Sequence, residues 1–193
     1  MHGRRSIRTS LVAATLSVSL SLVACGTATE PTGAATGAAA PAQSQAPEWF
    51  GLTMTDVRTG QHFTIQDFHG KVVLLETMAV WCPTCRAQQD EVKRLHDLVG
   101  DRSDLVSISV DVDMGEDAAT LKDYATTLGY GWHVAVAPLL VARALGNLYS
   151  AEYLDPPASP MLFVDRSGAV YTLPYGLKKA EALQETLAPY LGS

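Results

Sequence analysis

The hydrophobic pattern changes period along the chain, and the changes predict the secondary structure. Residues 71–75 form an almost continuous apolar run, which is typical of a strand buried on both faces. After Cys85 the apolar positions Val92, Leu95, Leu98 and Val99 recur at helical spacing, so a helix follows that strand. A strand leading directly into a helix is therefore the first local unit that the pattern predicts.

The rest of the pattern alternates between strands and helices. Two short strands that form a hairpin are expected at residues 49–52 and 61–65, around a turn at 58–60. Further along we expect strands at 105–111 and 132–137, helices at 116–128 and 139–145, a hairpin of strands 161–165 and 169–173, and a closing helix at 178–191. This order predicts an α/β sandwich covering residues 48–193.

The first 47 residues have a different composition. Residues 1–24 combine Arg4, Arg5 and Arg8 with an apolar segment too short to span a membrane, as in a secretion signal. The segment ends in residues 22–25, Leu-Val-Ala-Cys, which resembles the lipobox of bacterial lipoproteins. That resemblance implies cleavage before Cys25 and lipidation of its thiol; the alternative is an ordinary signal peptide cut nearby. Residues 25–47 then form a small-residue, polar tether that we expect to be disordered.

Composition limits the classes of function. The chain has 193 residues and 47% hydrophobic residues, enough for one domain with a real core. Its net charge is −6 and no basic run offsets it, so nucleic acid is not an expected partner. Three cysteines are too few for a disulfide-built scaffold.

The strongest chemical signal is the stretch Trp81-Cys82-Pro83-Thr84-Cys85 at the predicted strand–helix junction. Pro83 suits the first helical position, which would place Cys82 at the helix N-terminus. Free N–H groups there favour an anion, so the pKa of the Cys82 thiol should fall and the thiolate should be a nucleophile. Cys85, one turn further on, is placed to close a redox-active disulfide with Cys82.

Two other interpretations of the cysteine pair remain. A zinc site needs four ligands, and neither a second cysteine pair nor a spaced histidine pair is present. A purely structural disulfide would close a very short loop and would stabilise the fold little. We therefore expect no metal and no cofactor.

The order of elements, with Trp-Cys-x-x-Cys after the first core strand, resembles thioredoxin. The extra N-terminal strands, the inserted strand and helix, and the lipobox-like segment make residues 48–193 most similar to the membrane-anchored TlpA/ResA family. That resemblance implies a three-layer α/β/α sandwich with a central mixed sheet. It also implies an extracytoplasmic enzyme that reduces disulfides of exported proteins or of apocytochrome c, with electrons from a membrane donor.

The resemblance also assigns roles to individual residues. Ser159 and Pro160 match the position where the family has a cis-proline facing the cysteine pair, so with Trp81, Pro83 and Thr84 they are expected to bind substrate. On position alone, a trans bond that only begins the next strand is the alternative.

Glu76 lies six residues before Cys82, where thioredoxin has a buried acid. Burial would raise the pKa of its carboxyl group, which would then take the proton of Cys85 as that thiol attacks a mixed disulfide. The alternatives are an ion pair with Lys71 or Arg86, or a position facing water.

The chain departs from the family between residues 147 and 158, where the connection is longer than usual. Tyr149 and Tyr153 in that segment either shape a groove for a partner or belong to a solvated loop. Three other functions remain open. The pair could bind copper as in related assembly chaperones, it could oxidise substrates instead of reducing them, or the domain could be a redox-inert binding module.

Overall fold

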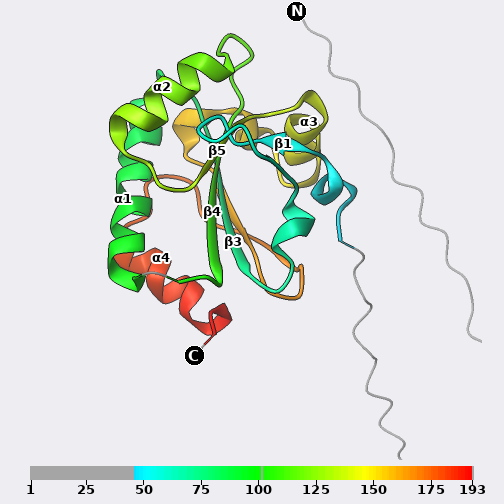
Figure 1. Cartoon of the computed structure of the whole chain (residues 1–193). Helices are drawn as coiled ribbons and strands as arrows, with labels where there is room; N and C mark the ends of the chain where they lie inside the picture. Colours follow the sequence, from blue (N-terminus) through cyan, green and yellow to red (C-terminus); the bar gives the residue numbers. More distant parts are fainter. Residues whose placement is uncertain (1–45, 101, 193) are drawn as a thin grey trace, which may run out of the picture. The chain divides into compact units, whose positions relative to one another are not determined.

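The computed structural model of this chain describes residues 46–100 and 102–192 (Figure 1). The predicted signal segment, Cys25 and nearly all of the predicted tether lie outside these residues, so their assignments stay predictions. No helix in the described ranges is long and apolar enough to cross a membrane.

A five-stranded mixed sheet forms the centre of the domain, with strand order β5-β4-β3-β6-β7. The strands are β3 (Val72–Met78), β4 (Leu105–Asp111), β5 (His133–Val136), β6 (Met161–Val164) and β7 (Val170–Thr172). β3, β4 and β5 run parallel, whereas β6 is antiparallel to β3 and to β7. All seven residues of the central strand β3 are buried, as its continuous apolar run predicts.

Helices cover both faces of the sheet (Figure 1). The helices α1 (Pro83–Val99), α2 (Ala118–Leu128) and α4 (Ala180–Leu187) pack on one face, and α3 (Leu139–Leu148) packs on the other with the N-terminal segment. Successive residues of β3 therefore feed two separate cores: Leu74 and Met78 pack under α1, whereas Val73 and Leu75 face α3. This is the predicted three-layer α/β/α sandwich.

The N-terminal elements differ from the prediction in one place. The hairpin exists, but its first strand is β1 (Met54–Thr55), which pairs with β2 (His62–Phe63). The predicted strand at 49–52 is wrong, since those residues lie in a 3₁₀ helix, η1 (Glu48–Gly51). Trp49 and Phe50 are both buried, and a helical turn lets two consecutive side chains face one core, which an alternating strand does not.

The connection from α3 to β6 is built from short helical turns. These turns are the 3₁₀ helices η3 (Ala151–Leu154) and η4 (Pro156–Ala158). A further 3₁₀ helix, η2 (Ile65–Phe68), lies earlier in the chain, between β2 and β3.

The predicted closing helix is shorter than expected: α4 ends at Leu187 and a 3₁₀ turn, η5 (Ala188–Tyr190), follows. Pro189 lies in that turn, and it has no backbone N–H to donate the hydrogen bond that would continue an α-helix.

Candidate active site at the start of α1

The cysteine pair lies where β3 ends and α1 begins. Cys82 is the N-cap residue of α1 and Pro83 is its first residue, as the sequence predicts. The Cys82 sulfur accepts a hydrogen bond from the backbone N–H of Cys85, with an N–S distance of 3.1 Å. A thiolate at Cys82 would be stabilised by this N–H and by the helix dipole, both of which lower a thiol pKa.

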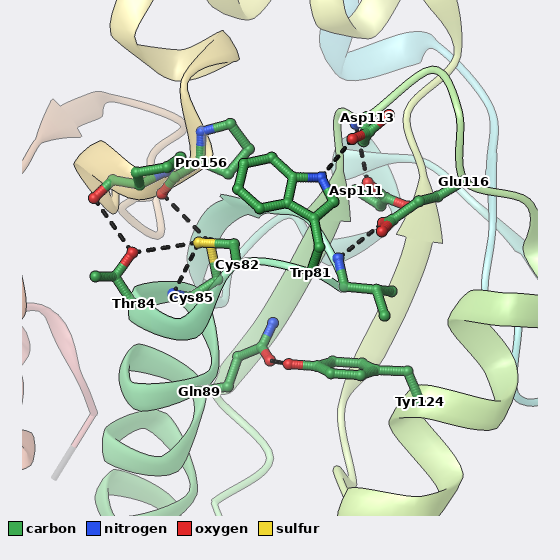
Figure 2. Close-up of a disulfide and its surroundings, with 12 residues drawn as sticks. Trp81, Cys82, Thr84, Cys85, Gln89, Asp111, Asp113, Glu116, Tyr124 and Pro156 are labelled. Atoms are coloured by element: carbon green, nitrogen blue, oxygen red, sulfur yellow. Dashed lines mark hydrogen bonds between the residues drawn. A yellow bond between two sulfur atoms is a disulfide. The ribbon is translucent and has the colours of Figure 1, made fainter.

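Cys82 and Cys85 form a disulfide, and neither is accessible in this oxidised state. Their exposed fractions are 1% and 2%. The η4 turn lies against them: the Cys85 sulfur is 3.3 Å from the Pro156 carbonyl oxygen, and the Thr84 hydroxyl is 3.3 Å from the carbonyl oxygen of Pro157 (Figure 2). Reaction with a partner thiol therefore requires the η4 turn or the Trp81 side chain to move.

Carboxylates from the β4–α2 loop hold the residues that precede Cys82 (Figure 2). The Trp81 indole N–H donates to Asp113, and the Val80 backbone N–H donates to Glu116 with an N–O distance of 2.7 Å. The indole is 56% exposed, so this bond fixes an otherwise free ring beside the disulfide. Asp111, fully buried behind them, has its pKa raised to about 7 by burial and by the neighbouring negative charges.

Glu76 lies in the middle of β3, on the face covered by α1. Its carboxylate accepts a hydrogen bond of 2.6 Å from the Ser109 hydroxyl, which itself accepts one of 2.8 Å from the Trp132 indole. Only 4% of the residue is exposed. Burial raises the Glu76 pKa to about 7, and the Ser109 hydrogen bond, the nearby Gln89 amide and the charge of Lys178 offset that rise in part. Glu76 is therefore buried, as expected from the thioredoxin resemblance. It does not face water and forms no ion pair with Lys71 or Arg86.

A second side-chain pair lies between α1 and α2 under the site. The Tyr124 hydroxyl donates to the Gln89 side-chain oxygen at 2.7 Å, and Gln89 is 1% exposed (Figure 2). This bond directs the amide end of Gln89 toward Glu76, where it lowers the carboxyl pKa. Glu76 is thus bordered by polar groups from β4 and α1, inside a core that is otherwise apolar.

The structure changes the expected roles of Ser159 and Pro160. The expected cis bond is wrong: the described residues contain no cis peptide bond. Ser159 instead takes a left-handed conformation, with φ of 47°, and so turns the chain from η4 into β6. Both residues are buried, and the polar contacts that Pro156 and Thr84 make with the cysteine pair do not involve them. Substrate binding by Ser159 and Pro160 stays a prediction that needs the site to open.

The two tyrosines of the long connection do not line a groove beside the disulfide. Tyr153 is fully buried, and its hydroxyl donates to the Met161 carbonyl oxygen at 2.7 Å. Tyr149 accepts a hydrogen bond of 3.1 Å from the indole of Trp49, on the α3 face of the sheet. Both alternatives given for this loop are therefore wrong, because the tyrosines anchor the connection to the core.

Three groups near the site escaped the sequence analysis: the Pro156–Pro157 pair, the Asp113–Glu116 pair as supports of Trp81 and Val80, and Lys178. The double proline was a visible signal of a rigid turn. The acids precede α2 in the sequence, and the neighbouring Asp117 caps that helix with its side chain. Within residues 46–100 and 102–192, no three His, Cys, Asp or Glu side chains are grouped so as to hold a metal ion.

Comparison with known proteins supports a redox site. The sequence profile described as Redoxin matches residues 35–184. A search of curated proteins finds no significant match.

Solved structures share the fold. MTB DsbF is 16% identical, with a TM-score of 0.60 over 76% of this chain and 100% of that one. A secreted Mycobacterium tuberculosis disulfide oxidoreductase homologous to E. coli DsbE is 17% identical, with a TM-score of 0.56 over 75% and 99%. The exposed lipoprotein thioredoxin Etrx1 of Streptococcus pneumoniae is 23% identical, with a TM-score of 0.53 over 72% and 98%.

The buried Glu76 predicts a pH-dependent stability. The folded chain keeps the Glu76 proton up to about pH 7, whereas the unfolded chain releases it near the usual pKa of 4.5. Between these values the folded state binds more protons, so the free energy of unfolding falls as the pH rises. Glu76→Gln should remove this contribution, which amounts to about 3 kcal/mol for a shift of this size.

Urea unfolding of the oxidised full-length chain at pH 5 and pH 8 measures the effect. We expect the variant to lose less stability than the wild type between the two pH values. The slope due to Asp111 remains in both proteins and cancels in the comparison. An equal loss in the two proteins would contradict the burial of an ionisable Glu76.

Proposed function

We propose that this chain, which belongs to the Redoxin family, reduces disulfides in exported proteins from the outer side of a membrane. It is a thiol-disulfide oxidoreductase, because it combines membership of that family with a Cys-x-x-Cys disulfide at the start of α1. The observation that carries the proposal is the capping of α1 by the Cys82 sulfur, which favours a thiolate at one cysteine of the pair.

The reduced protein performs two exchange steps. The Cys82 thiolate attacks one sulfur of a substrate disulfide, and the other substrate sulfur leaves as a thiolate that takes a proton from water. Cys85 then attacks the Cys82 sulfur of this mixed disulfide and releases the second substrate thiol. Two electrons pass from the protein to the substrate, and the Cys82–Cys85 disulfide, the state seen here, is the product.

The second step needs a base for Cys85. Its thiol is buried at the first turn of α1, and a buried thiol tends to stay protonated. Glu76, with a pKa of about 7, is ionised in a useful fraction at neutral pH and can take that proton. Pairing a capped thiolate with a buried carboxylate divides the roles of nucleophile and resolving cysteine.

The proposed location follows from the N-terminal sequence. Residues 1–24 act as a signal, Cys25 carries the lipid anchor, and residues 26–47 separate the domain from the membrane. Structural neighbours described as a secreted oxidoreductase and an exposed lipoprotein are consistent with this location. The partners are then disulfide-bearing exported proteins, apocytochrome c among them, and a membrane electron donor that reduces the pair again.

Glutathione disulfide tests the division between the cysteines. Cys85→Ser should accumulate a mixed disulfide with glutathione at Cys82, because no thiol remains to resolve it. Cys82→Ser should accumulate little, since Cys85 lacks the capping position. Intact-mass spectrometry after brief exposure to glutathione disulfide at pH 7 measures the fraction of each variant that carries the adduct.

Similar adducts in the two variants would contradict the nucleophile–resolver division. Stoichiometric Cu(I) binding by the reduced wild type, abolished in either variant, would favour the copper-chaperone alternative.

The reduction potential of the pair tests the direction of exchange. We expect a value near or below about −250 mV, where thioredoxin-type reductases lie. Equilibration of the full-length chain with glutathione and dithiothreitol buffers, followed by alkylation, measures it. A value near about −120 mV would make the protein an oxidase of substrate thiols instead.

The anchor is tested by Cys25→Ser. The wild type should partition with membranes in a bacterial host and carry a lipid mass at its N-terminus. The variant should be released or mislocalised, with its Cys82–Cys85 disulfide and thermal unfolding unchanged. A wild type that is wholly soluble and has a free Cys25 thiol would overturn this part of the proposal.

A further inference from the structure

Lys178 lies in the loop between β7 and α4 and is fixed to the helix that carries the cysteines. Gln88, three residues after Cys85, binds its backbone twice: the Gln88 amide donates to the Lys178 carbonyl at 3.0 Å and accepts from its N–H at 2.8 Å. Gln88 is 1% exposed, so both bonds are shielded from water. The Lys178 backbone therefore keeps a constant position relative to α1.

The side chain of Lys178 reaches the segment that precedes Pro160. Its ammonium group donates to the carbonyl oxygens of Ser159 and Gly176, the latter at 2.7 Å. The Gly176 N–H also donates to the Ala158 carbonyl oxygen at 2.9 Å. These bonds tie the η4 turn, which lies against the disulfide, to the β7–α4 loop.

The bond from Lys178 reaches a residue with an unfavourable backbone conformation. Ser159 has a φ of 47°, a left-handed conformation that is sterically unfavourable for a non-glycine residue. Such a conformation persists when surrounding contacts determine it. For Ser159 those contacts are its own N–H bond to Pro156, at 2.8 Å, and the Lys178 bond to its carbonyl.

Lys178 also acts on Glu76. Burial lowers the Lys178 pKa to about 8, and the negative charge of Glu76 raises it in part. In return the positive charge of Lys178 lowers the pKa of Glu76. The remaining groups around Glu76 are Ser109 and Gln89, and the phenols Tyr124 and Tyr130.

Those other groups carry no positive charge. Burial raises the pKa of Tyr124 to about 12 and that of Tyr130 still higher, so both stay neutral. Arg86 acts on Tyr124 and is not among the groups that shift Glu76. Within the described residues, Lys178 is thus the cation that favours ionised Glu76.

We propose that Lys178 is a positioning residue of the exchange site: its ammonium group holds the Ser159 carbonyl and offsets the charge of Glu76 when that carboxyl group ionises. This inference rests on the proposed role of Glu76 in resolving the mixed disulfide. It adds an upper limit to the working pH range, because a lysine that loses its proton near pH 8 can no longer balance Glu76.

The test compares Lys178→Met, Lys178→Arg and Lys179→Met in the full-length chain. Lys179→Met is the matched control, since it removes the same charge one residue away, where the side chain pairs with Glu91. Two quantities are measured from pH 5 to 10: the Glu76 carboxyl pKa by NMR, and the rate at which Cys85 releases glutathione from a preformed mixed disulfide at Cys82.

In the wild type we expect the release rate to rise with the Glu76 ionisation near pH 7 and to change again near pH 8. Lys178→Met should raise the Glu76 pKa and move the first inflection upward with it. A shift of one unit would reduce the ionised fraction, and the rate at pH 7, about five-fold. Lys178→Arg should keep the first inflection and lose the second, because arginine stays charged. Lys179→Met should keep both.

An unchanged Glu76 pKa in Lys178→Met would overturn the inference and leave Lys178 as a structural tie only. If Lys178→Met does not fold, Glu76→Gln supplies the reciprocal measurement, since coupling between two sites is mutual. That variant should lower the Lys178 pKa below about 8, and an unshifted Lys178 would equally overturn the inference.

The NMR values separate this inference from the proposed function. A Glu76 pKa that responds to Lys178 in a protein that does not reduce disulfides would retain the coupling and reject the proposed function.

Discussion

The structure depends on the passage from β3 into α1. β3 is buried along its whole length, so its hydrogen bonds to β4 and β6 fix the strand without help from solvent. The chain then leaves the sheet and, after residues 79–82, begins a helix whose first free N–H groups need an acceptor. Cys82 supplies that acceptor through its sulfur. The same hydrogen bond therefore caps α1 and stabilises the thiolate form of Cys82, so this residue contributes both to the stability of the helix and to the reactivity of the site.

The same core contains an ionisable group that does not help it fold. An ionised carboxylate inside an apolar layer is costly, and the bonds from Ser109 and the approach of Gln89 offset only part of that cost. The result is a carboxyl group with a pKa of about 7 on the face of β3 that α1 covers. A leucine at position 76 would fit the pattern of β3 better, which is a physical reason to regard Glu76 as functional.

Fold prediction from this sequence worked where periodicity was strong. The strand 105–111 has the predicted bounds, and the buried β3 and the β6–β7 hairpin appear where the pattern places them. The failures lie where tertiary contacts decide a local choice. Trp49 and Phe50 form a helical turn because one core accepts both rings, and Tyr153 is buried in a connection that reads as polar. Propensity is a weak determinant in such segments, since packing energies exceed it.

The sequence by itself determined the chemistry: two cysteines at a strand–helix junction, a proline at the first helical position, and an acid in an apolar strand. Those features are local, because capping and burial on a continuous strand follow from neighbouring residues. Only the tertiary structure decided what surrounds the pair. Pro156 over Cys85, Asp113 on the Trp81 indole, and Lys178 beside Glu76 come from residues about 30 to 100 positions away. Their meeting is set by strand order and loop path, which no spacing along the chain encodes.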